Sequence, residues 1–287
     1  MIAEPTYHLH LISDSTGETV NAVARACLVQ FEGVAVTEHL WSLVRTRGQL
    51  EKVITAVQAT PGPVIFTLID GKLRDFLTEE SRRLGIVCIS VLDPIMNALG
   101  HHFHSSGAGA PGRQHAMDAE YFARIDAMHF TLAHDDGQST HDLNGADAVL
   151  VGPSRTSKTP TCVYLANRGV KAANYPLVPN IAPPEALFAA TRPLIVGLIT
   201  DPERLVQIRR NRLRLLQEEV ETDYTDLEQV TEEMKNARRL FTKHDWPVID
   251  VTRRSIEETA AAIMQMLAER RDLKAAKREA EETPVGE

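Results

Sequence analysis

The segment Gly152-Pro-Ser-Arg-Thr-Ser-Lys158-Thr159 constrains the fold of this chain more than any other. It directly follows an apolar run, residues 146–151, and directly precedes an amphipathic stretch, residues 158–168, which meets a helix stop at Gly169. Short apolar runs predict buried strands, and apolar residues spaced by three and four predict helices. The segment is therefore predicted to connect a buried strand to a helix.

The same alternation of apolar runs and amphipathic stretches covers most of the chain. Strands are predicted at residues 8–13, 64–69, 86–91, 146–151, 194–199 and 248–251. Helices are predicted from residue 20 to about residue 33, at residues 49–58, 72–84, 158–168, 203–219 and 226–242, and from residue 255 onward. Strands that alternate with helices are typical of parallel sheets. The predicted fold class is therefore α/β, with an open parallel sheet in the N-terminal part.

A length of 287 residues is enough for two packed cores. Residues 1–145 are predicted to form an N-terminal α/β domain with a connecting region, and residues 146–275 a C-terminal P-loop kinase-like domain. Residues 276–287 are predicted to be a charged tail, and the charge that follows Arg270 predicts a frayed end. Between the domains, glycine and proline in residues 105–112 predict a mobile loop.

Composition and charge exclude several classes of function. The formal net charge is −8, so no general attraction to nucleic acid or to an anionic membrane is expected. No apolar run approaches the roughly 18 residues of a membrane span, and residues 1–6 do not resemble a secretion signal. Cys27, Cys88 and Cys162 lie far apart in apolar surroundings, which favours buried free thiols in a reducing compartment. A cytoplasmic protein is predicted.

The segment from Gly152 to Thr159 has the Walker A spacing, with Ser157 in the position of the second glycine. A loop that ends at a helix N-terminus directs several backbone N–H groups and the positive end of the helix dipole at one anion. Lys158 could then reach a terminal phosphate, and the Thr159 hydroxyl could bind Mg²⁺. The predicted nucleotide-binding residues are Gly152, Pro153, Ser154, Arg155, Thr156, Ser157, Lys158 and Thr159.

An ordinary polar turn capped by Ser154 or Thr156 is the alternative to a phosphate site. Two residues also depart from the best composition for phosphate binding. Serine at position 157 narrows the allowed backbone angles, although a loop without positive φ there would lose nothing. Pro153 removes one N–H donor from the loop. Neither departure forbids phosphate binding.

Candidate acid and base groups lie outside this loop. His134, Asp135 and Asp136 could accept a proton from a hydroxyl group, or could form an Asx-type turn with solvated acids. Asp201 ends an apolar run, where it could associate with Mg²⁺ or could cap the helix that begins at Pro202. The choice of general base among these residues stays open.

Further clusters are less specific. Residues 14–18, Asp-Ser-Thr-Gly-Glu, could bind an anion or form a capping turn. The arginines of residues 204–214 could bind a phosphoryl group or could solvate their helix and pair with Glu218 or Glu219. The three histidines of residues 101–104 are interpreted as part of a flexible loop, because adjacent histidines do not easily converge on one metal ion.

Several blocks of sequence resemble one protein family. GPSRTSKTPTCVYLA at residues 152–166, followed by AANYP at residues 172–176, is similar to the signature of the pyruvate, phosphate dikinase regulatory proteins of bacteria and plastids. ISDSTGET, ARIDAMHFTLAHDDG and DPERLVQIR, which begin at residues 12, 123 and 201, agree with the resemblance. The branch that acts on phosphoenolpyruvate synthase carries Cys-Gly where Thr156-Ser157 stands here, which favours the dikinase branch. Pro153 replaces the valine usual in the family.

The resemblance implies a bifunctional enzyme. One activity is an ADP-dependent kinase that phosphorylates a threonine of pyruvate, phosphate dikinase and inactivates it. The other is a phosphorylase that uses phosphate to remove this group as pyrophosphate. Predicted catalytic residues are Lys158, Asp201, His134 and Asp135, with ADP as donor and Mg²⁺ at Thr159. The dikinase is expected to contact the N-terminal half, the loop at residues 101–112, or both.

Three alternatives are kept open. The same chemistry could act on phosphoenolpyruvate synthase. The chain could be a P-loop kinase that transfers phosphate from ATP to a small molecule, or a nucleotide-sensing module that inhibits its partner without chemistry. The oligomeric state, a homodimer included, is also left open.

Overall fold

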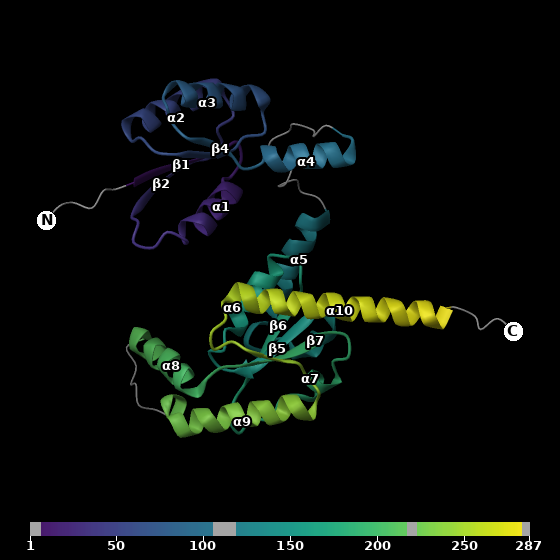
Figure 1. The fold of residues 1–287 in the computed structure, drawn as a ribbon. Helices are drawn as coiled ribbons and strands as arrows, with labels where there is room; N and C mark the ends of the chain where they lie inside the picture. The colour runs from purple at the N-terminus through teal and green to yellow at the C-terminus, as the bar shows by residue number, and fades with distance from the viewer. Residues whose placement is uncertain (1–6, 106–118, 217–222, 283–287) are drawn as a thin grey trace. The chain divides into compact units, whose positions relative to one another are not determined.

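The chain contains two four-stranded parallel sheets, which confirms the α/β class (Figure 1). The computed structural model describes residues 7–105, 119–216 and 223–282. Contacts divide the chain into two compact units, Met1–Ala116 and Met117–Glu287. None of the helices within the described residues is long and apolar enough to cross a membrane.

The first unit has the strand order β2-β1-β3-β4. Its strands are β1 (Tyr7–Ser13), β2 (Val36–Trp41), β3 (Val64–Thr67) and β4 (Cys88–Ser90), and its helices are α1 (Glu18–Leu28), α2 (Arg47–Ala59), α3 (Gly71–Arg83) and α4 (Asp93–Phe103). Helix α1 packs on Leu9 and Leu11 of β1, while α2 and α3 pack on the opposite face around Ile12. A capping box of Thr46 and Gln49 begins α2 and fixes where its apolar stripe meets the sheet.

The second unit has the equivalent order, β6-β5-β7-β8. Its strands are β5 (Ala148–Pro153), β6 (Ala172–Leu177), β7 (Leu194–Ile199) and β8 (Val248–Asp250). Its helices are α5 (Ala119–Ala133), α6 (Lys158–Ala166), α7 (Glu185–Ala189), α8 (Pro202–Leu216), α9 (Leu227–Lys243) and α10 (Ile256–Glu282), with short 3₁₀ turns at Asp135–Gly137, Thr140–Gly145 and Asp223–Thr225. Helices α8 and α9 cover one face of the sheet, and α6 and α10 cover the other.

In this order, the chain leaves the neighbouring strands β5 and β7 toward opposite sides of the sheet. Open parallel sheets bind ligands at such a switch point, outside the carboxyl ends of the strands. The loop at residues 152–159 begins there, because β5 ends at Pro153 and α6 begins at Lys158.

All six predicted strands and all seven predicted helices are present, with ends shifted by a few residues. Two edge strands, β2 and β6, were not predicted. Strand β2 is largely exposed and contains the polar residues Thr37, Glu38 and His39, and β6 contains Pro176, so neither reads as a buried apolar run. Helices α4, α5 and α7 were not predicted either.

Three expectations about the chain are wrong. His101 and His102 lie in the last turn of α4 and not in a loop, and His104 caps that helix in a left-handed conformation. The rest of the predicted mobile loop, after Ser105, lies outside the described residues. Helix α10 continues to Glu282, so residues 271–282 are not a frayed tail, because alanine and long charged side chains favour helix.

The third correction concerns the thiols. Cys162 is buried and Cys88 is half-buried, but Cys27 is exposed in the last turn of α1. Within α1 only Val20 and Ala24 are buried, and Leu28 in the last turn is partly buried against the same cluster.

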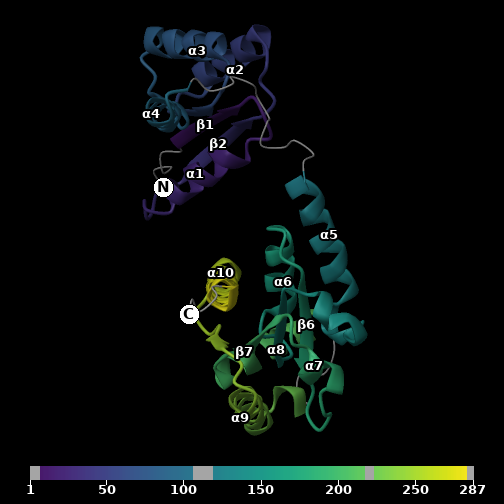
Figure 2. The ribbon, with the colours of Figure 1, turned by 90° about the vertical axis from the view of Figure 1, so that its right-hand side faces the viewer.

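Residues 117–145, which the sequence placed with the N-terminal domain, fall in the second unit. Helix α5 runs beside α6 and β6 (Figure 2). The Thr131 hydroxyl donates a hydrogen bond to the backbone oxygen of Ala172 over 2.7 Å, and Thr131 is buried. The contacts of α5 therefore connect it to the sheet that carries the 152–159 loop.

The close packing of α9 on β7 gives a stability prediction. A Cβ atom at Gly197 would lie 2.4 Å from Cδ2 of Phe241, whose side chain is fully buried. We expect Gly197→Ala to lower the free energy of unfolding by about 1–3 kcal/mol through overpacking. Chemical denaturation would measure the loss.

The control for this prediction is Gly48→Ala in α2, where an added Cβ meets nothing within 4 Å. This change is expected to be neutral or slightly stabilising. Equal denaturation midpoints for Gly197→Ala and the unmodified chain would contradict the packing argument.

Candidate functional site

The loop at residues 152–159 leaves the sheet between two strands that approach closely. A Cβ atom at Gly152 would lie 2.4 Å from the backbone oxygen of Leu198 in β7, so only glycine fits at this point. Thr156 is buried, and its hydroxyl donates to the backbone oxygen of Pro153 over 2.9 Å. This hydrogen bond folds the loop back on the end of β5.

Two residues of the loop have left-handed backbone angles. Arg155 has φ of 73° and Ser157 has φ of 61°. The predicted cost of replacing glycine by serine therefore applies, because residues with a side chain adopt positive φ rarely. Strain of this kind occurs often at ligand-binding loops.

Lys158 begins α6, and its side chain is buried under the loop. The Nζ atom donates to the backbone oxygen of Pro153 over 2.8 Å, and the residue is only 4% exposed. Burial lowers the pKa of Lys158 to about 8, although the negative charges of Asp136 and Asp135 favour the ammonium form. The loop thus holds a cation in a position with little access to water, where charge acts strongly on a bound anion.

Asp135 and Thr159, predicted separately from the sequence, are in contact. The Thr159 hydroxyl donates to Oδ1 of Asp135 over 2.9 Å. The side-chain amide of Asn174, in β6, donates to the same carboxylate oxygen, and its Oδ1 accepts from the backbone N–H of Asp136 over 3.0 Å. The turn at Asp135–Gly137 is therefore attached to the first turn of α6.

Asn174 was missed as a site residue by the sequence reasoning. It lies in the AANYP block, which carried part of the family resemblance, but an asparagine in a short strand gives no chemical signal of its own. Its function at this site depends on residues far away in the sequence.

Arg209 of α8 holds the other side of the loop. It is 1% exposed and forms a bidentate pair with Glu233 of α9, with nitrogen to oxygen distances of 2.7 and 3.2 Å. It also donates to the backbone oxygens of Ser154 over 3.2 Å and of Tyr224 over 3.0 Å. Arg209 is therefore a structural support of the loop and not a solvating charge.

Tyr224 completes this support. Its ring lies under the Arg209 guanidinium, 4.2 Å from the ring centroid to Cζ, and its hydroxyl lies 3.2 Å from Oγ of Ser154. A charged group in contact with an aromatic face is stabilised by the ring quadrupole. Helices α8 and α9 thus fix the backbone on the Ser154 side of the loop.

His134 is buried between α5 and β6. Its Nδ1 lies 2.8 Å from the backbone oxygen of Phe130, and its ring stacks on the Phe130 ring at 3.8 Å. Its Nε2 is buried and has no hydrogen-bond partner within the described residues. Because Nδ1 must donate to the carbonyl oxygen, Nε2 of the neutral ring is a free acceptor.

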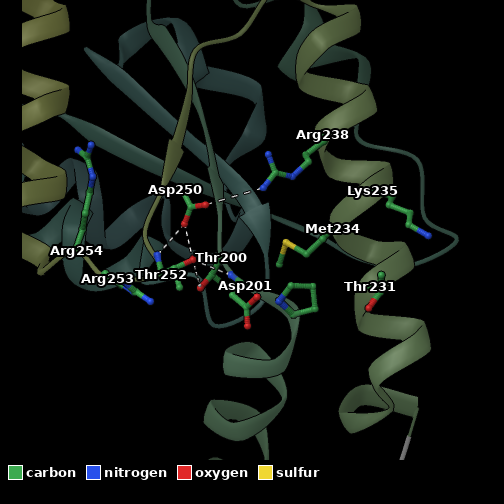
Figure 3. Close-up of a pocket in the computed structure, with 11 residues that line it drawn as sticks. Thr200, Asp201, Thr231, Met234, Lys235, Arg238, Asp250, Thr252, Arg253 and Arg254 are labelled. Atoms are coloured by element: carbon green, nitrogen blue, oxygen red, sulfur yellow. Dashed lines mark hydrogen bonds and ion pairs between the residues drawn. The ribbon is translucent and has the colours of Figure 1, made fainter.

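Asp201 lies in a separate cavity of about 570 Å³ at the ends of β7 and β8 (Figure 3). Its Oδ1 accepts from the backbone N–H of Arg204 over 3.0 Å, so it caps α8, and its own N–H donates to the Thr252 hydroxyl over 2.8 Å. Four cations also line this cavity: Lys235, Arg238, Arg253 and Arg254. The loop residues 152–159 do not line this cavity, although Asp201 and the loop both follow the carboxyl ends of neighbouring parallel strands, β7 and β5.

Comparisons with known proteins agree on one family. The kinase/pyrophosphorylase family model matches residues 9–264. A protein of Paramagnetospirillum magneticum is 58% identical over 94% of this chain and 88% of its own length. Relatives from Rhizorhabdus wittichii and Caulobacter vibrioides are 52% and 51% identical over 92% and 91% of this chain, and over 96% and 83% of their own lengths. All three carry the name pyruvate, phosphate dikinase regulatory protein.

The buried pair of Arg209 and Glu233 gives a second stability prediction. Arg209→Met leaves the Glu233 carboxylate without its partner. The Glu233 side chain is only 11% exposed. We expect the free energy of unfolding to fall by about 3–5 kcal/mol, because an uncompensated buried charge is costly. Chemical denaturation measures the effect.

Arg210→Met is the matched control, since Arg210 is the exposed neighbour on the same helix. A change within about 0.5 kcal/mol is expected there. The double variant Arg209→Met with Glu233→Leu should recover part of the loss. Similar losses for Arg209→Met and Arg210→Met would contradict the structural role of the pair.

Proposed function

Because this chain belongs to the kinase/pyrophosphorylase family, we propose that the loop at residues 152–159 is its phosphate site and that its target is pyruvate, phosphate dikinase. The family match and the relatives' names indicate that the chain is a phosphotransferase with kinase and phosphorylase activity. In the proposed reactions, ADP donates a phosphoryl group to a threonine of the dikinase and inactivates it. Inorganic phosphate then removes the group and restores the dikinase.

The observation that carries this proposal is the environment of Lys158. A buried ammonium group lies at the start of α6, beneath a loop whose backbone turns at the carboxyl edge of the sheet. Helix N-termini and nearby cations stabilise phosphate oxygens. Such a local site can bind phosphate although the chain has a formal net charge of −8.

The two reactions need the same arrangement. In the kinase direction, the threonine oxygen bonds to the β-phosphorus of ADP, the bond to the bridging oxygen breaks, and AMP leaves with the electron pair while the hydroxyl proton is released. In the phosphorylase direction, a phosphate oxygen bonds to the phosphorus of phosphothreonine, the bond from that phosphorus to the threonine oxygen breaks, pyrophosphate is released as the product, and the threonine oxygen takes up a proton. Positioning and charge neutralisation supply most of the rate in both cases.

The residues around Thr159 fit a magnesium ion. Thr159 Oγ1 and the Asp135 carboxylate are hard oxygen ligands 2.9 Å apart, and Mg²⁺ in phosphoryl-transfer sites usually takes one or two carboxylates together with phosphate oxygens. We propose that these two residues hold Mg²⁺, which would neutralise phosphate charge when bound. His134, Asp135 and Asp201 stay candidates for accepting the hydroxyl proton.

We also propose that the first unit contributes to contact with the dikinase, and that the protein works in the cytoplasm. The small number of cysteines supports a reducing compartment. The oligomeric state, a homodimer included, can be measured by sedimentation.

The function is tested with ADP labelled in the β-phosphate. The purified protein is incubated with pyruvate, phosphate dikinase or with phosphoenolpyruvate synthase, and the modified residue is located by mass spectrometry. We expect phosphothreonine in the dikinase. Labelling of the synthase alone would change the assigned target. Transfer only from ATP to a metabolite, or inhibition without phosphothreonine, would refute the proposed chemistry.

Lys158→Ala tests the loop itself. We expect both reactions to be lost, by at least a hundredfold, with the circular dichroism spectrum unchanged. Lys243→Ala, at the exposed end of α9, is the control and should keep both activities. Near-normal transfer by Lys158→Ala would show that the loop has been assigned wrongly.

The lowered pKa of Lys158 predicts a pH dependence. The free protein loses the ammonium form as the pH rises through about 8, so kcat/KM for ADP should fall above that pH, by about tenfold per pH unit. Below pH 8 the ammonium form persists, and this group does not limit the rate. A profile that stays flat to pH 10 at saturating dikinase would contradict a catalytic ammonium at this position.

A further inference from the structure

A second cavity, of about 380 Å³, opens beside the 152–159 loop. Pro153 of the loop forms one wall, residues 177–183 after β6 form another, and one face of α9 from Gln229 to Leu240 forms the third. This volume lies within the range of roughly 300–1,000 Å³ that is usual for small-molecule sites.

The walls of this cavity are largely apolar. Pro153, Leu177, Pro179, Pro183 and Leu240 contribute flat or branched hydrocarbon surface. Apolar side chains in residues 177–183 are also left uncovered, since Val178 is 46% exposed and Ile181 is 61% exposed. Such a surface suits a flat ring system, which would remove these side chains from water.

A few polar groups are available around the apolar walls. Asn180, Gln229 and Asn236 supply side-chain amides, and Glu232 supplies a carboxylate at the exposed rim. A carboxylate accepts hydrogen bonds but cannot donate them. It therefore favours a ring that carries an amino group over one that carries a carbonyl oxygen at the same position.

The cavity and the loop share one support. Glu233 lines the cavity and pairs with Arg209, which also donates to the backbone oxygen of Ser154 in the loop. The larger cavity around Asp201 has no such connection to the loop, because none of the loop residues lines it. Its lining is also more charged, since it contains four cations and two acids. Of the two, the smaller cavity includes Pro153, at the start of the loop, in its lining and has the apolar character that a nucleobase needs.

We propose that this smaller cavity holds the adenine and ribose of the nucleoside diphosphate whose phosphates occupy the 152–159 loop. The inference rests on the proposed use of ADP and extends it to the recognition of the base. Pro153 would lie between the two parts of the ligand. Glu232 would accept a hydrogen bond from the 6-amino group of adenine and would repel the 6-oxygen of guanine.

The proposal separates the two reactions. Phosphate and pyrophosphate have no base, so the phosphorylase direction does not need this cavity. The kinase direction does, because its donor must be held by the base as well as by its phosphates. A change confined to the cavity should therefore weaken only the kinase.

Asn236→Trp tests this separation, since Asn236 is exposed on α9 and a tryptophan there would fill the cavity. We expect KM for ADP in the kinase reaction to rise tenfold or more, while the rate of phosphorolysis with inorganic phosphate stays within about twofold. Lys243→Trp, on the same helix but away from the cavity, should change neither reaction. Folding of each variant is checked by thermal denaturation.

Glu232→Gln supplies a second measurement that does not depend on filling the cavity. Among the residues that the structure describes, its carboxylate forms ion pairs with Lys235 and Arg239 alone, and both pairs are exposed, so little stability is expected to be lost. An amide can donate to the 6-oxygen of guanine, so the preference for ADP over GDP, measured as the ratio of Kd values, should fall at least fivefold.

The outcomes distinguish this inference from the proposed function. Unchanged ADP affinity in Asn236→Trp and an unchanged ADP to GDP ratio in Glu232→Gln would overturn the nucleobase site while leaving the loop assignment intact. Equal loss of both reactions in a folded Asn236→Trp protein would also overturn it, since the cavity would then serve the shared phosphate site. Failure of the unmodified protein to use ADP at all would instead refute the proposed function.

Discussion

The arrangement of the site depends on the buried contact between Arg209 and Glu233. This pair joins α8 to α9, and through Ser154 and Tyr224 it also joins both helices to the loop after β5. A guanidinium group can satisfy several acceptors at fixed angles, which a lysine cannot do. The loop backbone is consequently held from outside, and this allows Arg155 and Ser157 to keep left-handed angles that a free loop would abandon.

The two sheets have the same strand order but use their switch points differently. In the first unit, the buried carboxylate of Asp14 accepts a hydrogen bond from the backbone N–H of Ile69 over 2.6 Å, which connects the segment after β1 to the segment after β3. In the second unit, the corresponding position is occupied by a loop with a buried cation, Lys158. One topology thus supports an internal acid in one unit and a candidate anion site in the other.

Much of this architecture could be predicted from the sequence because it depends on local pattern. The strand, loop and helix around Lys158 require only an apolar run, a polar turn and helical spacing, and all three lie within about 20 residues. The contact between Asp135 and Thr159 could not be predicted, because it depends on how α5 packs against β6. For the same reason, the sequence left open whether Arg209 binds a phosphoryl group or solvates its helix, since its partner Glu233 lies 24 residues away on another helix.

The burial of Lys158 beneath one short loop has a consequence for regulation. A single binding site for phosphate oxygens cannot hold a diphosphate donor and the products of phosphorolysis at the same moment. On the proposed function, occupancy by one ligand excludes the opposing reaction, and the direction of net transfer follows the relative abundance of the competing anions. Mutual exclusion at this site would prevent the two opposing reactions from occurring in one protein molecule at the same moment.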